Sequence, residues 1–320
     1  MRAAYVAQLI PDAPLDGLVV GERPEPSERA DWTTVQVKAA SLNHHDLWAL
    51  RGIGLSAAQL PMILGTDAAG IAPDGSEVIV HGVIGGDGVG VPPTERRSLL
   101  SEKYQGTFAE YVTVPTANLI PKPPELSFAD AACLPTAYLT AYEMLFRASH
   151  LSPGHSVLVQ GIGGGVATAA IVLGAAAGLE VYATSRHSYK RDRGREIGAV
   201  WTGKPGDKLP KRVDAVIESV GAATWASSVR AVRPGGTIAV CGATSGDAPP
   251  AELSRIFFQE IRVQGVTMGT RPDLAALANF LATTGTRPVI DSEFPLERIH
   301  AGLERLAAGY QTGKIVINIA

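Results

Sequence analysis

A run of glycines at residues 161–167, GIGGGVA, is the first pattern in this sequence that predicts chemistry. It follows the strand-like run VLVQ and precedes an apolar helical segment. The spacing is G-x-x-G-x-x-A. A side chain at the first position, Gly161, would obstruct a tight turn, and one at the second, Gly164, would hold the backbone away from a pyrophosphate. A small third residue, Ala167, lets the helix pack on the strand. The helix N-terminus would present free N–H groups and a positive dipole to phosphate. The candidate cofactor-binding residues of this turn are Gly161, Gly164, Gly165, Val166 and Ala167.

The same segment has two other interpretations. Residues 157–179 carry no charge, and a membrane-spanning helix needs about 20 apolar residues. However, the glycines gather in one turn before the helix, and the flanks lack the basic asymmetry of a membrane segment. The sequence therefore predicts a strand, a turn and a buried helix, and no membrane association. A glycine-rich packing turn that binds no ligand remains the alternative.

The next strand-like run ends in residues that distinguish between the two nicotinamide dinucleotides. NAD sites place Asp or Glu at this point to accept a hydrogen bond from the ribose 2′-hydroxyl. This sequence has Ser185 and Arg186 there, with Lys190 one helical turn on. A hydroxyl and two cations suit a 2′-phosphate, which Arg can bind through two hydrogen bonds. These residues favour NADP(H), although Arg186 could instead be an ordinary surface residue of a helix.

The elements around this turn alternate between strand and helix patterns. Buried-type strand runs occur at 156–160, 180–185, 213–220, 236–242 and 261–268. Helical segments between most of them predict parallel βαβ units and thus an α/β fold with a doubly wound sheet. The first 120 residues or so are β-rich, and a helical segment at 128–149 contains Pro135, which should break or restart it. The tail returns to helix, strand, helix and the final strand KIVINI.

Composition excludes several classes of function. The net charge is −3 and no long basic run is present, so the sequence predicts no nucleic-acid binding. Its two cysteines, Cys133 and Cys241, exclude a disulfide framework and a cysteine-based zinc site, and they fit a reducing compartment. The first residues have no long apolar core behind Arg2, so we expect no signal peptide and a cytoplasmic protein.

Several motifs in order give the sequence a family resemblance over essentially its full length. They are SLNHHDLW (41–48), LGTDAAG (64–70), YLTAYEML (138–145), VLVQGIGGGVA, RPGGTIAVCG (233–242), VQGVTMGT (263–270) and GKIVINI. With them the chain resembles the medium-chain dehydrogenase/reductase superfamily. The resemblance implies a GroES-like β-rich catalytic domain from residues 1–122 and 267–320, and an NADP(H)-binding Rossmann domain from residues 123–266.

The resemblance also shows what this sequence lacks. Zinc members of the superfamily hold a catalytic metal through Cys, His and Cys, and the corresponding positions here are Asn43, Thr66 and about Ala137. The four-cysteine structural zinc lobe, expected around residues 85–105, contains no cysteine. We therefore predict no metal site, because thiolate and imidazole ligands are missing at these positions. An improvised site built from His44, His45, Asp67 and His81 is the alternative.

The branch of the family that this absence implies is the zinc-independent quinone oxidoreductases and alkenal reductases. There the nicotinamide gives hydride to an electron-poor conjugated system, and the developing oxygen charge needs hydrogen-bond donors and a proton source. The resemblance assigns catalytic roles to Asn43, His45 and Thr140. It implies cofactor contacts for His44, Thr136, Gly242, Ala243, Thr244, Gly269 and Lys314. The simpler interpretations are a turn cap for Asn43 and a hydrogen-bonded loop histidine for His45.

The predicted function is zinc-free, NADPH-dependent reduction of quinones or related conjugated carbonyls, which are small electron-poor molecules. The alternative enzyme is a 2-alkenal or enone double-bond reductase, and a non-catalytic NADPH-binding regulatory protein is the alternative from another class. Enoyl thioester reductases of the superfamily usually show a Tyr between the first two motifs, and residues 51–62 contain none. By resemblance we expect a homodimer that pairs the last Rossmann strand, 261–268.

Overall fold

The computed structural model describes residues 1–85 and 97–319 and divides the chain into two compact units. The first unit comprises the residues up to Thr136 together with those from Thr270 onward, and the second comprises Ala137–Gly269. Residues 86–96, which belong to the cysteine-free stretch 85–105, lie outside the described residues. None of the helices in the described part is long and apolar enough to cross a membrane.

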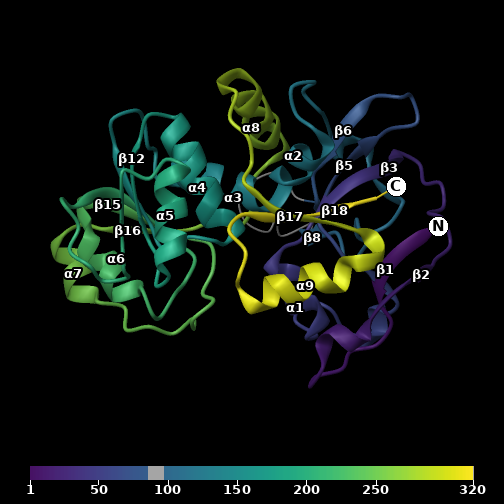
Figure 1. The fold of residues 1–320 in the computed structure, drawn as a ribbon, viewed down its shortest axis with the longest axis horizontal. Helices are drawn as coiled ribbons and strands as arrows, with labels where there is room; N and C mark the ends of the chain where they lie inside the picture. Colours follow the sequence, from purple (N-terminus) through teal and green to yellow (C-terminus); the bar gives the residue numbers. More distant parts are fainter. Residues whose placement is uncertain (86–96, 320) are drawn as a thin grey trace. The chain divides into compact units, whose positions relative to one another are not determined.

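The second unit is built on a six-stranded parallel sheet (Figure 1). In spatial order its strands are β13 (Trp201–Gly203), β12 (Glu180–Thr184), β11 (Ser156–Val159), β14 (Val213–Glu218), β15 (Val232–Val240) and β16 (Arg262–Gly265). The order runs outward in both directions from β11, so the sheet is doubly wound. Its topological switch point lies between the carboxyl ends of β11 and β14.

Helices cover this sheet because its central strands are apolar on both faces. All four residues of β11 are buried, and α4 (Gly165–Ala176) packs on β11 and β12. The helix α5 (Ser188–Glu196) packs on β12 and β13, and α6 (Trp225–Ala231) packs on β14 and β15. A strand that is buried on both faces has a continuous run of apolar residues in its sequence. These strands could therefore be predicted from the sequence.

The first unit contains mainly antiparallel sheets. Within the described residues its largest sheet orders β10 (Leu119–Pro121), β6 (Glu77–Val80), β5 (Asp67–Ile71), β3 (Trp32–Ser41), β18 (Lys314–Asn318) and β17 (Ile290–Pro295), with β9 (Tyr111–Pro115) also on β3. A second sheet orders β2 (Leu18–Glu22), β1 (Arg2–Val6) and β4 (Met62–Ile63). The short strands β7 (Val83–Ile84) and β8 (Ser98–Leu99) pair with each other.

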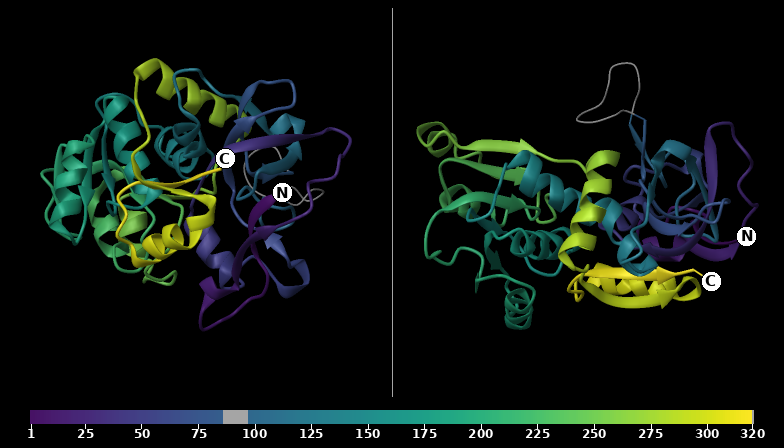
Figure 2. Two further views of the ribbon diagram at one scale, coloured as in Figure 1. Left: turned by 45° about the vertical axis from the view of Figure 1, so that its right-hand side comes forward. Right: turned by 90° about the horizontal axis from the view of Figure 1, so that it is seen from above.

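The C-terminal segment completes the first unit. It consists of α8 (Arg271–Thr284), β17, α9 (Ile299–Ala308) and β18, as the tail of the sequence predicted. β18 pairs antiparallel with β3, so residues near 315 lie beside residues near 40 (yellow and purple in Figure 2). The remaining helix at the start of this unit is α1 (His44–Leu50), which follows β3 directly.

The boundary between the units differs from the one that the sequence suggested after residue 122. The helix α2 (Phe128–Ala132) packs on β3 and β5, and the Ser41 hydroxyl donates to the Ala132 carbonyl over 2.9 Å. Residues 123–136 therefore belong with the first unit. The helical segment is interrupted at Pro135 as predicted: wide π-type turns at Leu134–Tyr138 and Glu143–Ala148 flank the short α3 (Leu139–Tyr142). The last helix is α7 (Leu253–Phe258).

Candidate functional site

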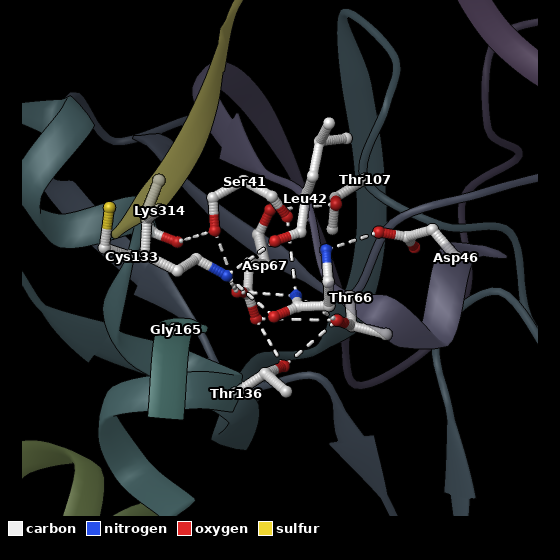
Figure 3. A network of polar contacts seen from close by, with 12 residues as sticks. Ser41, Leu42, Asp46, Thr66, Asp67, Thr107, Cys133, Thr136, Gly165 and Lys314 are labelled. Atoms are coloured by element: carbon white, nitrogen blue, oxygen red, sulfur yellow. Dashed lines mark hydrogen bonds and ion pairs between the residues drawn. The ribbon is translucent and has the colours of Figure 1, made fainter. Parts of the chain in front are cut away.

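A buried ion pair occupies the place in the first unit where three neighbouring strands end. β18 begins at Lys314, β3 ends at Ser41, and β5 begins at Asp67, and strand pairing brings these ends together. The Lys314 Nζ lies 3.3 Å from Asp67 Oδ2, and both side chains are almost completely buried. The ammonium group also donates to the Leu42 carbonyl (2.8 Å) and to Asn43 Oδ1 (2.7 Å). Figure 3 shows Lys314 with Asp67 and Leu42. All three ammonium protons thus have an acceptor, as a buried cation requires.

The Asp67 carboxylate accepts hydrogen bonds from several directions. Ser41 Oγ and Asn43 Nδ2 each donate to Oδ2 over 2.9 Å. Thr136 Oγ1 donates to Oδ1 over 2.5 Å, and the Thr66 hydroxyl lies 3.0 Å from that of Thr136. With Lys314 these groups form a closed polar network around one carboxylate (Figure 3). A buried charge that is paired and hydrogen-bonded in this way stays ionised at modest cost.

The start of α1 connects this network to a second buried carboxylate. Asn43 precedes the helix, and its backbone N–H donates to Asp46 Oδ2 over 2.7 Å. Asp46 Oδ1 has no partner among the described residues. Burial raises the pKa of Asp46 to about 6, and the nearby Asp67 adds to the rise, while His45, the Asn43 N–H and Lys314 oppose it. Asp46 is thus a carboxyl group that titrates close to neutral pH.

The adjacent histidines at the start of α1 are shifted in opposite directions. Burial lowers the pKa of His44, and the positive charges of Lys314 and Arg51 lower it further. Burial also disfavours the charged form of His45, but its hydrogen bond to Glu102 and the charges of Asp46, Glu102 and Asp67 outweigh burial and raise its pKa. His45 Nε2 lies 3.0 Å from Glu102 Oε1. Neighbouring groups with divergent pKa values are typical of acid–base sites.

In the second unit, the glycine turn between β11 and α4 adopts backbone angles that favour glycine. Gly161 and Gly163 adopt φ values of +91° and +127°, which residues with a side chain rarely reach. A Cβ on Gly164 would point into open space, with no atom within 4 Å. No side chain of the described residues caps α4, so its first N–H groups have no side-chain acceptor at the cap. A dinucleotide pyrophosphate fits this turn, because it needs close backbone approach and free helix donors.

A chain of hydrogen bonds fixes the carboxyl ends of the strands around this turn. The Gly161 N–H donates to Thr184 Oγ1 (3.3 Å), and the Thr184 hydroxyl donates to Gln160 Oε1 (2.7 Å). Gln160 Nε2 continues to Ser228 Oγ (3.0 Å), which donates to the buried Glu218 carboxylate (2.6 Å). Sequence inspection missed this chain, because Gln160 and Thr184 resemble ordinary strand ends. Its role is to hold the turn at the switch point of the sheet.

The residues predicted for the 2′-phosphate lie together at the end of β12. The Ser185 side chain is largely buried, Arg186 is exposed, and Lys190 on α5 is largely buried. Arg191, which was not predicted, donates from its guanidinium to the carbonyls of Ser185 (2.8 Å) and Arg186 (3.2 Å). It braces the backbone that carries the two predicted residues. The exposed Arg186 guanidinium leaves its donor fork available to a ligand.

Comparison with known proteins identifies the family. A model described as an alcohol dehydrogenase GroES-like domain matches residues 29–124, and one described as a zinc-binding dehydrogenase matches residues 162–283. A zinc-type alcohol dehydrogenase-like protein of Schizosaccharomyces pombe is 30% identical over 89% of this chain and 90% of its own length. The chain belongs to the medium-chain dehydrogenase/reductase family. It is therefore a pyridine-nucleotide-dependent oxidoreductase with a GroES-like domain and a Rossmann domain.

Two further relatives show how varied this family is. A 2-methylene-furan-3-one reductase of Solanum lycopersicum is 31% identical over 92% of this chain and 73% of its own length. The solved structure of an NAD-dependent alcohol dehydrogenase is 30% identical, covers 100% of both chains and superimposes with a TM-score of 0.90. Relatives of this medium-chain dehydrogenase/reductase thus include both enone-type reductases and alcohol dehydrogenases.

The zinc that the family implies does not match the donors at the corresponding place in this member. Asn43 offers an amide and Thr66 a hydroxyl where the resemblance places the first two zinc ligands, and the amide oxygen of Asn43 already accepts from Lys314. Neither group is the thiolate or imidazole that zinc sites use. Across residues 1–85 and 97–319, no group of three or more His, Cys, Asp or Glu side chains could hold a metal ion. The alternative of an improvised site from His44, His45, Asp67 and His81 is not formed.

The remaining predicted residues divide between the two units. In the first, Thr136 belongs to the polar network beside Asn43 and Lys314. In the second, Thr140 lies buried in α3, and Gly242, Ala243 and Thr244 form the turn after β15. A Cβ on Gly269 would lie 2.6 Å from the Glu143 side chain, so close packing alone already requires this glycine. Glu102 was missed, because nothing in its local sequence distinguishes it from a surface residue.

Proposed function

We propose that this protein is an NADPH-dependent reductase that acts without zinc on quinones or related conjugated carbonyls. The observation that carries the proposal is the polar network around Asp67. Where zinc members of the family would hold their metal, this chain has the amide of Asn43 and the hydroxyl of Thr66, next to the ammonium of Lys314. The Asn43 amide oxygen already accepts from Lys314, and neither the amide nor the hydroxyl is a thiolate or imidazole, so the donor set favours chemistry that needs no Lewis acid.

In such a reductase the residues of the two units have different roles. Bound NADPH supplies a hydride to the electron-poor substrate. The turn at Gly161 and Gly164 and the start of α4 hold the pyrophosphate, and the turn at 242–244 lies near the nicotinamide by resemblance. His45 supplies the proton for the substrate oxygen that gains negative charge. Asn43 and Thr136 keep the charge of Lys314 and Asp67 in place, while Thr140 contacts the nicotinamide side of the substrate.

The cofactor preference for NADPH rests on the end of β12. Ser185 and Arg186 stand where an NAD site would carry a carboxylate, and Lys190 lies on the first turn of α5. A hydroxyl donor with two cations stabilises the dianionic 2′-phosphate through charge-assisted hydrogen bonds. The bracing of this backbone by Arg191 keeps Arg186 directed outward, where a phosphate can meet it.

A second candidate is reduction of the carbon–carbon double bond of enones or 2-alkenals. The similarity to the 2-methylene-furan-3-one reductase of Solanum lycopersicum favours it, because that name describes an enone substrate. Both candidates share the hydride donor and the proton source, and they differ in the carbon that receives the hydride. Product analysis therefore distinguishes them directly.

The experiment that tests the proposal follows NADPH consumption with quinones, 2-alkenals, enones, ketones and alcohols, with NADH in parallel and with and without a chelator. We expect turnover of quinones or enals with NADPH that the chelator leaves unchanged. Chelator-sensitive oxidation of alcohols would contradict the zinc-free proposal. Binding of NADPH without turnover of any substrate would instead support a non-catalytic binding protein.

We also propose that the protein is a cytoplasmic homodimer. The sequence has only two cysteines, Cys133 and Cys241, which is a composition that fits a reducing compartment. β16 forms an edge of the Rossmann sheet, and all four of its residues are exposed. The adjacent α7 exposes the large apolar side chains Leu253, Phe257 and Phe258. An exposed strand edge beside apolar side chains is a suitable surface for pairing two copies of the chain.

A further inference from the structure

The side chains of His45 and Glu102 are in contact, although no motif in the sequence links the two residues. His45 lies at the start of α1, whereas Glu102 lies in the turn after β8, 57 residues further on. Their side chains are 17% and 30% exposed, so the pair is largely screened from solvent and Glu102 is its more accessible end. A hydrogen bond of 3.0 Å in this environment is much less weakened by water than one at the surface.

The surroundings of Glu102 hold its carboxylate toward the imidazole. Its Oε2 accepts from the Leu99 N–H (3.4 Å), and its backbone carbonyl accepts from Gln59 Nε2 (2.6 Å). The preceding Ser101 is buried and adopts a positive φ of +68°, which fixes the direction of the turn. A Cβ on Gly54 would lie 3.3 Å from Glu102 Oε1, so the chain at Gly54 packs close to the oxygen that contacts the imidazole.

The pairing determines which nitrogen of His45 can act. An ionised carboxylate only accepts hydrogen bonds, so Nε2 must carry the proton that faces Glu102. The other nitrogen, Nδ1, is buried and has no partner among the described residues. A buried ring nitrogen without a partner costs about 1–3 kcal/mol, and such an atom calls for an explanation. A ligand oxygen that takes the place of the missing partner provides one.

The charges around His45 all act in the same direction. Glu102, Asp46 from its own helix and Asp67 from β5 are negative, and each favours the imidazolium form. The positive groups Lys314 and Arg51 act on the neighbouring His44. The pKa of His45 is thus raised against the effect of burial, whereas that of His44 is lowered. An imidazolium is the form of histidine that donates a proton.

We propose that Glu102 is the positioning residue of the proton donor: it binds the Nε2–H of His45 and thereby directs the transferable proton to Nδ1. This inference rests on the proposed function. When reduction leaves negative charge on the substrate oxygen, the Nδ1–H bond breaks and an O–H bond forms, while Nε2–H stays bound to the carboxylate. His45 becomes neutral, and a proton from solvent restores the Nδ1–H bond after the product has left.

The test compares wild-type protein with Glu102→Gln and His45→Gln. Gln keeps a carbonyl oxygen that accepts from Nε2–H but removes the charge that favours the imidazolium. NMR titration of the histidines, with the His45 signal assigned from its absence in His45→Gln, should show a lower pKa of His45 in Glu102→Gln. The control is Glu77→Gln, which removes a carboxylate of the same unit that pairs with Lys122 instead. In that variant the His45 titration should stay unchanged.

The kinetic half of the test uses the best substrate of the wild-type enzyme. The rate should fall as pH rises through the pKa of His45, and Glu102→Gln should move that fall to lower pH. At pH values above the wild-type pKa of His45, kcat of the variant should be reduced about tenfold and KM changed less than about twofold. His45→Gln should lose about 100-fold in kcat at pH values below the pKa of His45, where the wild-type imidazole is protonated, and should lose the fall with pH. An unchanged His45 titration, or an unchanged pH profile despite a shifted titration, would overturn the inference. Absence of wild-type turnover would instead refute the proposed function. In that case the difference in His45 pKa between wild type and Glu102→Gln would still test whether the two side chains interact.

Discussion

Asp46 shows how a single buried carboxyl group can make stability depend on pH. Burial raises its pKa from 3.8 to about 6, so between these values the folded chain keeps a proton that the unfolded chain releases. The free energy of unfolding therefore falls as pH rises from about 4 to 6, and it stays lower above that range. The ionised Asp46 costs about 1–3 kcal/mol at pH 7.

The variant Asp46→Asn tests this penalty, because Asn keeps an oxygen that accepts from the Asn43 N–H but never becomes charged. We expect the unfolding free energy of the variant, relative to wild type, to increase by about 1–3 kcal/mol between pH 4 and pH 7. Urea denaturation at both pH values measures this difference. Asp12→Asn, at an exposed position, is the control and should show no such trend. A constant difference between variant and wild type across pH would contradict the prediction.

The Lys314–Asp67 pair illustrates the opposite case, a charge that the surrounding groups fully compensate. Lys314→Met removes the cation and leaves the buried Asp67 carboxylate with its hydroxyl and amide donors only. We expect a loss of about 3–5 kcal/mol in urea denaturation, because one uncompensated charge remains in the interior. The double variant Lys314→Met with Asp67→Asn should recover at least half of that loss. If the double variant were as unstable as the sum of the single variants, the pair would not be coupled.

At the scale of the elements, the end of β12 is where we propose that the cofactor preference is set. Arg186→Ala removes the exposed guanidinium that we assign to the 2′-phosphate. One charge-assisted hydrogen-bonded contact corresponds to an increase of about 10- to 100-fold in the KM for NADPH, whereas the KM for NADH should change less than about twofold. Steady-state kinetics with both cofactors measure the ratio. Arg193→Ala is the matched control, because Arg193 lies on the neighbouring helix α5 and its guanidinium pairs with Glu196. Equal effects on both cofactors would argue against a 2′-phosphate contact.

The elements of the Rossmann unit could be predicted from the sequence because each has a local signal. Fully buried strands such as Ser156–Val159 are continuous apolar runs, and the glycine turn has its own spacing. β13 was missed, because the three residues Trp201–Gly203 are too few to show a pattern. The helix break at Pro135 was predicted from the ring that removes a backbone donor.

The polar network could not be predicted in the same way, because its contacts depend on strand pairing between distant segments. Asn43 and Lys314 are each visible in a motif, but 271 residues separate them, and the register of β18 on β3 creates their contact. Glu102 carries no local signal at all. Its contact with His45 depends on a turn with positive φ at Ser101, which no periodicity encodes.

At the scale of the whole molecule, the unpaired edge of the Rossmann sheet is the feature that most needs an explanation. The edge strand β16 exposes Val263 at 47%, and α7 beside it exposes Phe258 at 80%. Exposed strand edges usually carry charged residues or prolines that prevent association; β16 is short and has Arg262, but it also exposes Val263, and α7, which precedes it in the chain, exposes apolar side chains. Two copies of the chain that pair along β16 would cover both features at once, in an isologous interface.

The variant Phe258→Glu tests this assembly, because it places a charge inside the proposed interface without touching the core of the second unit. A desolvated, unpaired carboxylate strongly opposes association, so we expect light scattering to change from a dimer to a monomer at micromolar concentration. Tyr310→Glu is the matched control: Tyr310 is an aromatic residue of the first unit that is 67% exposed, and its replacement should leave the dimer intact. Because the proposed active-site residues lie outside this surface, the monomer should retain NADPH binding. A wild-type protein that is monomeric at the same concentration would refute the proposed dimer, and α7 would then be an exposed apolar surface that requires another partner.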